Sequence, residues 1–311
     1  MTFSQLATFL AVARAGSVTG AAEVLVVTQP SVSAAVSALS REVGVELTER
    51  IGRNIRLTSA GQEFLPFAVD VLGLLEVGKR AAHVAAKASA LEVRIAAVTT
   101  AGEYLLPPLL QAFSLRHPEI GLTLEVANRR SVFQRVLDHS SDVAIAGRPP
   151  VSGGRLDGRR FLRNDLAVIA PMGDLLARRR SVPVEELADR TWLLREEGSG
   201  TRTMVEEFLS HNDARPTTLT LGSNGAIKQA VRIGLGLSLQ SRIAVELELE
   251  SGVLATIDVE GGLPTRHWYV LRSGSGPPRP PVQAFFDFVT TEAHGAIEAA
   301  HPGADVQAAR P

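Results

Sequence analysis

The chain has 311 residues, a formal net charge of −1, no cysteine and 45 % hydrophobic residues. This length suits two domains with substantial cores. The near-neutral charge excludes a bulk attraction to DNA or membranes, so any DNA contact must come from local placement. The lack of cysteine excludes disulfides, thiolate metal sites and a cysteine-based redox sensor. Without a signal-peptide pattern or an apolar run of roughly 18–20 residues, we expect a cytoplasmic protein that binds no membrane.

Two amphipathic helices are predicted near the N-terminus. Residues 3–15 carry apolar side chains at three-four spacing, and Gly16 suits the left-handed position that ends a helix. Residues 17–25 repeat this spacing. Ala21 and Ala22 are small enough for another helix to cross closely. These helices would form a compact helical domain together with the next one.

A third helix is predicted to begin at Thr28, whose hydroxyl can cap free amides, with Pro30 in its first turn. Three apolar residues point inward: Val32, Val36 and Leu39. Gln29, Ser33 and Ser37 lie four residues apart and share the outward face. Glutamine can pair with adenine, and serine can donate or accept a hydrogen bond. The pattern indicates a base-reading helix, and a merely solvated polar face is the alternative.

Residues 50–58 read as two short strands joined by a Gly/Asn turn, and they carry Arg50, Arg53 and Arg56. Arginines on a loop beside such a helix can neutralise DNA phosphates. Residues 1–61 hold five arginines against four glutamates, a net charge of +1. Because this charge is small for a nucleic-acid binder, we expect modest non-specific affinity and a dependence on dimer formation.

This N-terminal pattern resembles the DNA-binding domain of LysR-type transcriptional regulators, without a gap from Gly16 to Gly61. The matching residues are Gly16, Ser17, Ala21, Ala22, Thr28, Gln29, Pro30, Ser31, Val32, Ser33, Leu39, Gly44, Leu47, Arg50, Arg53, Leu57, Thr58 and Gly61. The resemblance implies major-groove contacts by Gln29, Pro30 and Ser33, and a backbone or minor-groove contact by Arg53. The complete set of expected DNA contacts is Thr28, Gln29, Pro30, Ser31, Ser33, Ser37, Arg50, Arg53 and Arg56.

Residues 61–90 are predicted to form a long helix followed by a hinge. Apolar and small residues keep the three-four spacing for about seven turns, and Pro66 can kink one early turn. The small domain cannot bury so long a stripe, so we expect the same helix of a second subunit as its partner. Packing on its own domain is the alternative. The linker helix of LysR-type proteins lies here, which favours a dimer, and a tetramer on DNA. Residues 85–90 read as the hinge.

From residue 91 the pattern alternates strands and helices, which predicts a parallel α/β architecture. Strands are expected at 91–98, 122–126, 142–145, 166–169, 192–194, 219–221, 235–239 and 266–272. Helices are expected at 105–116, 132–137, 201–209, 226–233 and 281–293. We expect lobe I at about 91–162 and 266–300, lobe II at about 163–265, and a disordered tail at 301–311.

The predicted fold class is thus α/β with an all-α N-terminal part. A winged helix-turn-helix domain (1–60) and a linker helix (61–90) precede an effector-binding domain (91–300). The two expected lobes resemble periplasmic-type ligand-binding domains, as they do in LysR-type regulators.

Several Ser/Thr/Gly loops follow strand ends, where parallel α/β lobes bind ligands. Each loop alone is usually only a helix cap, so their convergence on one cleft is the argument. LysR-type sensors bind effectors at the loops and strand ends that match most of these positions. The expected effector contacts are Thr99, Thr100, Asn128, Arg148, Ser199, Gly200, Thr201, Arg202 and Asn224. Their chemistry favours a small anion: a carboxylate, phosphate ester or oxyanion. Residues 194–202 are most similar to members tied to carbon fixation or to sulfur and nitrogen assimilation.

Motifs of enzymes are missing. The chain has no phosphate-loop lysine, no Gly-x-Gly-x-x-Gly after the first strand and no Gly-x-Ser-x-Gly. Its seven histidines do not pair at zinc spacing. We therefore predict no catalytic residue, no metal and no cofactor beyond a small-molecule effector.

The predicted function is sequence-specific DNA binding controlled by a small anionic effector between two α/β lobes. The expected partners are double-stranded operator DNA, further copies of the chain, the anionic metabolite and RNA polymerase. The alternative is a solute-binding protein whose N-terminal helices serve only dimerisation. A measurement of DNA affinity discriminates between the two.

Overall fold

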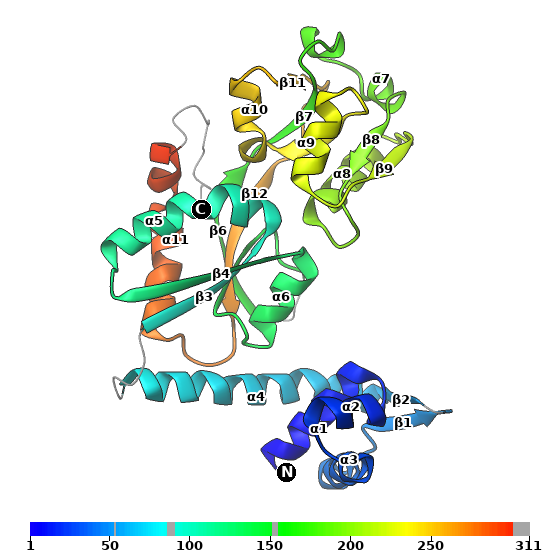
Figure 1. The fold of residues 1–311 in the computed structure, drawn as a ribbon, viewed down its shortest axis with the longest axis vertical. Helices are drawn as coiled ribbons and strands as arrows, with labels where there is room; N and C mark the ends of the chain where they lie inside the picture. Colours follow the sequence, from blue (N-terminus) through cyan, green and yellow to red (C-terminus); the bar gives the residue numbers. More distant parts are fainter. Residues whose placement is uncertain (53, 86–90, 151–154, 301–311) are drawn as a thin grey trace. The chain divides into compact units, whose positions relative to one another are not determined.

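The computed structural model describes residues 1–52, 54–85, 91–150 and 155–300. Residue contacts divide the chain into two units (Figure 1). The first unit contains the elements from α1 to α4, and residues 137–140 group with it. The second unit contains the elements from β3 to α11. The predicted hinge after Ala85 and the predicted tail lie outside the described residues.

The first unit is a winged helix-turn-helix followed by a long helix. Its elements are α1 (Phe3–Ala15), α2 (Val18–Leu25), α3 (Gln29–Val43), β1 (Thr48–Ile51), β2 (Asn54–Leu57) and α4 (Ser59–Ala85). The predicted helix signals are confirmed. Thr28 caps α3 by accepting from the Ser31 amide, Pro30 lies in the first turn, and Gly16 ends α1 at φ 64°. Ala21 and Ala22 are buried among the three helices, as their small size predicts.

The wing is joined tightly to the long helix. β1 and β2 pair antiparallel, which confirms the predicted hairpin. Directly after β2, the Thr58 amide donates to the Leu47 carbonyl (3.1 Å), and the Thr58 hydroxyl donates to the Glu46 carbonyl (2.7 Å). Gly61 in the first turn of α4 lies so close to the Leu47 carbonyl oxygen that any side chain there would overlap it. This contact explains why glycine is required at that position.

None of the helices in the described ranges is by itself long and apolar enough to cross a membrane. α2 and α3 reach the required length and composition only as a pair, and the chain bends by 105° between them.

Lobe I of the second unit is a five-stranded sheet with the order β4-β3-β5-β12-β6 (Figure 1). Its strands are β3 (Leu91–Val98), β4 (Ile120–Ala127), β5 (Val143–Ala146), β6 (Leu156–Asn164) and β12 (Arg266–Ser273). A π-helical turn (Ala101–Leu105), α5 (Leu106–Arg116), α6 (Arg129–Leu137) and α11 (Pro280–Ala300) complete it. Phe113, Phe285 and Phe286 are buried with the apolar side of β3, whereas Val132 and Phe133 of α6 pack with Ala96 and Ala144. α5 and α11 therefore cover one face of the sheet and α6 the other.

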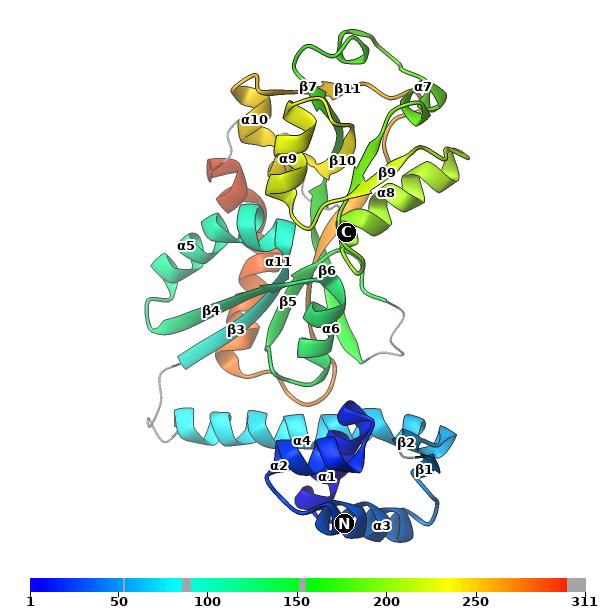
Figure 2. The same cartoon turned by 45° about the vertical axis from the view of Figure 1, so that its right-hand side comes forward.

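Lobe II is inserted between β6 and β12 (Figure 2). Its strands are β7 (Leu166–Pro171), β8 (Trp192–Leu194), β9 (Thr218–Thr220), β10 (Ser238–Ser241) and β11 (Leu254–Ile257). Its helices are α7 (Val184–Ala188), α8 (Gly200–His211), α9 (Asn224–Arg232) and α10 (Glu246–Glu250), with short turns at Leu176–Arg178 and Arg242–Ala244. Two sheets form, an antiparallel one ordered β10-β7-β11 and a parallel pair of β8 with β9.

The prediction of parallel sheets holds only in part. β3 pairs parallel with β4 and β5, but β12 runs antiparallel to both β5 and β6. The reason is the path of the chain, because β6 leads into lobe II and β12 returns from it. The strand predicted at 235–239 begins only at Ser238, since Gly234 turns at φ 81° and Leu235 stays exposed. β6, α7, α10 and β11 were not predicted.

A buried ion network closes the start of the lobe I sheet. The Asp142 side chain is 5 % exposed and accepts from the Arg94 amide (2.9 Å), the Arg94 guanidinium (3.1 Å) and Arg279 (2.9 Å). Burial acts to raise the pKa of Asp142, but hydrogen bonds and charge from Arg94, with the charge of Arg279, outweigh it and hold the pKa below its usual value. Because Arg279 also donates to the Glu92 carbonyl (3.1 Å), the network links β3 to the segment before α11.

We expect Asp142→Asn to lower the free energy of unfolding of the second unit by about 3 kcal/mol at pH 7, because the buried Arg279 and the partly buried Arg94 lose their counter-ion. A carboxyl whose folded pKa is lowered stabilises the fold above its unfolded pKa of about 4 and loses that contribution as pH falls through the folded value. The difference between variant and wild type should therefore shrink below about pH 4. Urea unfolding followed by circular dichroism at pH 7 and pH 3.5 measures both effects.

The control is Glu186→Gln, which removes an exposed carboxylate paired with Arg179. Exposed pairs contribute little to stability, so this variant should unfold like wild type. Equal losses in the two variants would contradict the role of burial.

Candidate functional site

The polar face of α3 is free for contact. Gln29, Pro30, Ser33 and Ser37 are exposed, and the apolar residues on the opposite side are buried as predicted. The hydroxyls of Thr28 and Ser31 lie 2.8 Å apart at the helix start, so both already take part in the cap. The face therefore offers one amide and several hydroxyls, which suits contact with base edges.

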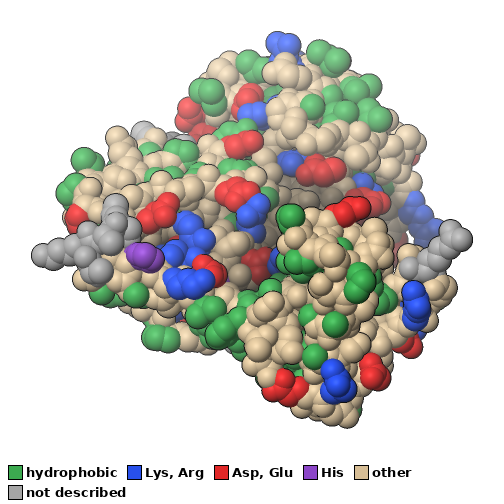
Figure 3. Space-filling view, turned by 60° about the horizontal axis from the view of Figure 1, so that its bottom comes forward, with side chains coloured by type: hydrophobic (Ala, Val, Ile, Leu, Met, Phe, Trp, Pro, Cys, Tyr) green, Lys and Arg blue, Asp and Glu red, His purple; other side chains and the backbone are tan. Residues whose placement is uncertain are grey.

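The three wing arginines differ in their surroundings. Arg50 is exposed on β1. Arg56 on β2 donates to the Glu49 carboxylate through Nε (3.0 Å) and Nη2 (2.7 Å), so a neighbouring acid offsets its charge. Arg53 lies outside the described residues. Figure 3, with the side of the N-terminal helices turned forward, shows scattered charged side chains among uncharged surface rather than one continuous basic patch.

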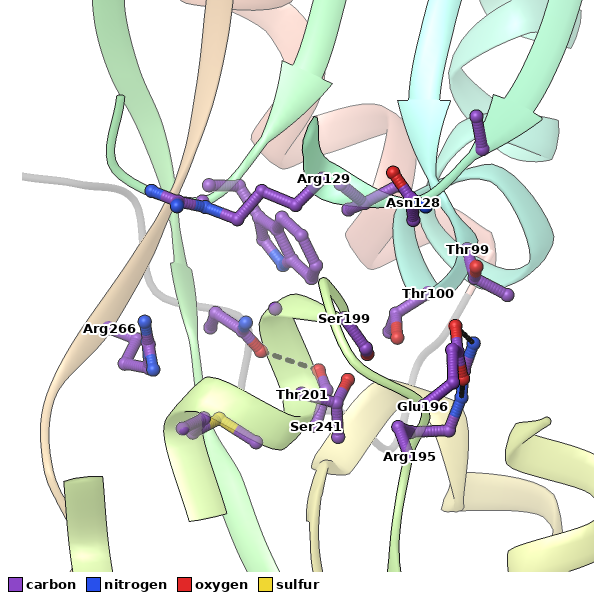
Figure 4. Close-up of a pocket in the computed structure, with 17 residues that line it drawn as sticks. Thr99, Thr100, Asn128, Arg129, Arg195, Glu196, Ser199, Thr201, Ser241 and Arg266 are labelled. Atoms are coloured by element: carbon purple, nitrogen blue, oxygen red, sulfur yellow. Dashed lines mark hydrogen bonds and ion pairs between the residues drawn. The ribbon is translucent and has the colours of Figure 1, made fainter. Parts of the chain in front are cut away.

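A cavity of about 60 Å³ lies where the carboxyl ends of β3, β4 and β5 face the loop before α8 (Figure 4). Six of the predicted effector contacts line it: Thr99, Thr100, Asn128, Ser199, Gly200 and Thr201. A cavity needs about 10–15 Å³ of such volume for each water, so this one has room for a few waters or a small polar ligand. The structure thus brings together loops from both lobes, as the sequence predicts.

The other three predicted effector contacts do not line this cavity. The Arg148 side chain is exposed, while its backbone carbonyl accepts from Arg129 (2.5 Å). Arg202 pairs with Glu206 one turn further along α8 (2.8 Å). Asn224 is 1 % exposed and lies behind the cavity wall, where it contacts wall residues from both lobes.

Two of the arginines that line the cavity, Arg129 and Arg266, lie on one side of it (Figure 4). Arg129 lies over the Phe133 ring at 4.8 Å, and Arg266 makes a 3.5 Å contact with the exposed Glu207. The pKa of Arg129 is lowered, first by burial and then by the positive charge of Arg266, with Glu207 acting in the opposite direction. Because two like charges repel each other beside the same cavity, a bound anion would be stabilised there.

On the opposite side of the cavity, a chain of hydrogen bonds, called the relay below, connects lobe II to lobe I through Arg195, Asn224 and Thr100. The side chain of Arg195 is 4 % exposed; it donates to Glu196 through Nε (2.7 Å) and Nη2 (2.9 Å) and to Asn224 through Nη1 (2.5 Å). The amide of Asn224 in turn donates to the Thr100 hydroxyl (3.3 Å). The relay therefore connects Thr100, a lining residue of lobe I, to a buried cation of lobe II.

Several polar or large lining residues were not among the predicted contacts: Arg129, Asn164, Arg195, Glu196, Met204, Ser241, Arg266 and Trp268. Arg129 directly follows Asn128, whereas Arg195 and Glu196 directly follow β8 at the start of the loop that leads to Ser199. A wider window at each strand end would therefore have included all three. Arg266 and Trp268 begin a strand instead of following one. If all strands ran parallel, the first residues of a strand would lie at the opposite end from the carboxyl ends, far from a ligand bound there.

Two family models match the chain, one for each unit. Residues 3–62 match the model of the bacterial regulatory helix-turn-helix protein of the lysR family. Residues 87–294 match the model of the LysR substrate binding domain. The chain therefore belongs to the LysR family of bacterial transcriptional regulators.

Named relatives agree with this assignment. The chain is 38 % identical over 292 residues to the HTH-type transcriptional activator CmpR of Synechocystis, covering 93 % of this chain and 94 % of that protein. It is 40 % identical over 293 residues to a RuBisCO operon transcriptional regulator of Allochromatium vinosum, covering 93 % and 95 %. The structure of the Synechocystis CcmR regulatory domain in complex with 2-PG matches with a TM-score of 0.61 and 32 % identity, over 65 % of this chain and 98 % of that one.

The fold and the family together define the two sites. The chain is a DNA-binding transcriptional regulator of LysR type, whose second unit is its effector-binding domain. The polar face of α3 and the wing are its candidate DNA interface, and the cavity is its candidate effector site.

Asn224→Ala should lower the free energy of unfolding of the second unit by about 2 kcal/mol, because the buried Arg195 loses an acceptor and Thr100 loses a donor. Gln229→Ala, on the exposed side of the same helix, is the matched control and should unfold like wild type. Urea unfolding measures both. An unchanged Asn224 variant would mean that the relay contributes nothing to stability.

Proposed function

We propose that this regulator binds a specific operator and that a small organic anion in the cavity controls that binding. The observation that carries the proposal is the position of Arg129 and Arg266, two cations beside one small cavity whose charges disfavour each other without an anion. Hydroxyls from Thr100 and Ser199 add hydrogen-bonding groups to the lining of the same cavity.

The chemistry of the cavity favours an anion with two charged ends. Arg129 and Arg266 lie on one side, and the Arg195 relay lies on the other (Figure 4). The ligand of the CcmR regulatory domain, 2-PG, is 2-phosphoglycolate, which carries a phosphate and a carboxylate. We therefore infer a small phosphorylated carboxylate as the effector class, and we infer no catalytic step and no further cofactor.

The proposed DNA interface consists of the exposed α3 face and the wing. Gln29, Ser33 and Ser37 would read base edges, while Arg50 would contact phosphate. Pro30, the Thr28–Ser31 cap, Arg53 and Arg56 complete the predicted set. Because the protein acts on operator DNA, we propose that it works in the cytoplasm, with RNA polymerase as a further partner.

The long helix supports assembly with a second copy. Phe67 is 67 % and Val71 43 % exposed on α4, so part of its apolar stripe is not covered by its own domain. A neighbouring apolar groove of about 440 Å³ is lined by residues that include Leu10, Leu25 and Leu72. We propose a homodimer through this surface, and a tetramer on DNA, which would place two recognition helices on a two-fold symmetric site.

Effector binding can change DNA binding only if the effector favours one arrangement of the protein over another. Since the cavity lies between the two lobes, a ligand that bridges them would favour a closed pair of lobes. The proposal is that this preference shifts the arrangement of the subunits on DNA.

The decisive experiment is fluorescence anisotropy with labelled DNA from upstream of the protein's own gene, competed with a random duplex at two salt concentrations. Binding that resists the competitor supports an operator-specific regulator, and the salt dependence counts phosphate contacts. Binding equal to that of random DNA across upstream fragments would support the solute-binding alternative.

Gln29→Ala should weaken operator binding about ten-fold, because one bidentate base contact contributes roughly 1–3 kcal/mol of discrimination. Binding to random DNA should stay unchanged. The matched control is Gln111→Ala, which removes an exposed glutamine on α5. Competition anisotropy measures all three proteins, and an equal loss on operator and random DNA would contradict base readout by Gln29.

Arg129→Gln should raise the Kd for 2-phosphoglycolate about ten-fold or more, because a charge-assisted hydrogen bond to the ligand is lost. Arg130→Gln is the matched control, since Arg130 is the exposed next residue and does not line the cavity. Isothermal titration measures both. Heat with an apolar aromatic ligand and none with any anion would rule out the anion class.

A further inference from the structure

One cation of the effector cavity is already bound to a carboxylate of the chain itself. The Glu196 carboxylate accepts two hydrogen bonds from Arg195, at 2.7 and 2.9 Å, in the paired geometry that arginine forms with carboxylate ligands. Both residues line the cavity. Glu196 therefore occupies the position that an acidic group of a ligand would take on Arg195.

The other two arginines that line the cavity do not form such a paired contact with a carboxylate. Within the described part of the chain, Arg129 forms no ion pair with a carboxylate and donates to the Arg148 backbone carbonyl instead. Arg266 contacts Glu207 at 3.5 Å, a longer and exposed contact. The cavity thus has one side open to an anion and one side on which an internal anion is bound.

In the Arg195–Glu196 pair, the arginine is held in place by other contacts, whereas the Glu196 side chain can move away. The Arg195 side chain is 4 % exposed and is held from behind by Asn224 (2.5 Å). The Glu196 side chain is 38 % exposed, so it can rotate into water without disturbing the core. After that rotation, Arg195 keeps its bond to Asn224 and presents two free N–H donors to the cavity.

Glu196 stays ionised while it occupies this position. Burial acts to raise its pKa, but the hydrogen bonds and charge of Arg195 outweigh this effect and hold the pKa below its usual value. A ligand must therefore displace a charged group, not a neutral acid.

We propose that Glu196 is a built-in competitor of the effector, which must displace it from Arg195 to engage both sides of the cavity. This inference rests on the proposed effector site. Its consequence is selectivity for ligands with two anionic groups. A single anion can bind beside Arg129 and Arg266 without moving Glu196, whereas a second anionic group of the ligand replaces the internal carboxylate.

The test compares Glu196→Gln and Glu196→Ala with Glu197→Gln. Glu197 is the exposed next residue and does not line the cavity. Its variant therefore removes the same negative charge without removing a partner of Arg195, and it controls for the change of charge. The probes are 2-phosphoglycolate and inorganic phosphate. Isothermal titration gives the Kd, and the fluorescence of Trp268, which lines the cavity, provides a second signal. Urea unfolding confirms that each variant is folded.

We expect both Glu196 variants to bind 2-phosphoglycolate about five- to ten-fold more tightly than wild type, as the loss of one partly exposed competing ion pair predicts. The Glu197 variant should match wild type, and the Kd for inorganic phosphate should change much less. Unchanged or weaker binding in the Glu196 variants overturns the inference, as does an equal gain in the Glu197 variant.

Failure of the underlying function gives a different result. If wild type binds 2-phosphoglycolate and the Glu196 variants bind it with the same Kd, only the competitor role is overturned. If no variant binds either anion, the anionic effector and the competitor role are both overturned.

Discussion

The pairing of β12 with both β5 and β6 determines where the candidate effector cavity forms. Since β12 returns from lobe II and runs antiparallel to β5, its first residues lie at the same end of the sheet as the carboxyl ends of the parallel strands. Arg266 and Trp268 thereby face Thr99 and Asn128 across one small volume. Without this reversal, the cavity would have hydroxyls and amides from strand ends, together with Arg129 and Arg195, but it would lack Arg266.

Charge is used differently in the two units. In the first unit, the candidate base-reading residues Gln29, Ser33 and Ser37 are uncharged and one wing arginine is paired with Glu49, so specific contacts matter more than general attraction to phosphate. In the second unit, cations are gathered beside a small cavity and one of them, Arg195, is held by a neighbouring acid. A regulator with almost no net charge thus relies on where each cation is placed.

Local signals made much of the fold predictable. Thr28, Pro30 and Gly16 mark helix ends through backbone chemistry that acts within a few residues, and the wing and most strands follow from periodicity. Six cavity residues were found because they follow strand ends or precede helices. Arg266 was missed because strand direction depends on the long-range path of the chain. The pairing of Arg195 with Glu196 and Asn224 depends on side-chain packing, which spacing does not encode.

The close approach of Gly61 to the Leu47 carbonyl affects how the winged domain and α4 can move. The first turn of α4 approaches the backbone before the wing closely there, and the hydrogen bonds of Thr58 to Leu47 and Glu46 join the same two segments, so we treat the winged domain and α4 as one arm. With 27 residues, α4 is about 40 Å long. Over that length, a tilt of about 5° displaces the far end by roughly 3.5 Å, close to the rise of about 3.4 Å per base pair. A small rotation of this arm would therefore shift the proposed DNA contact by about one step of the double helix.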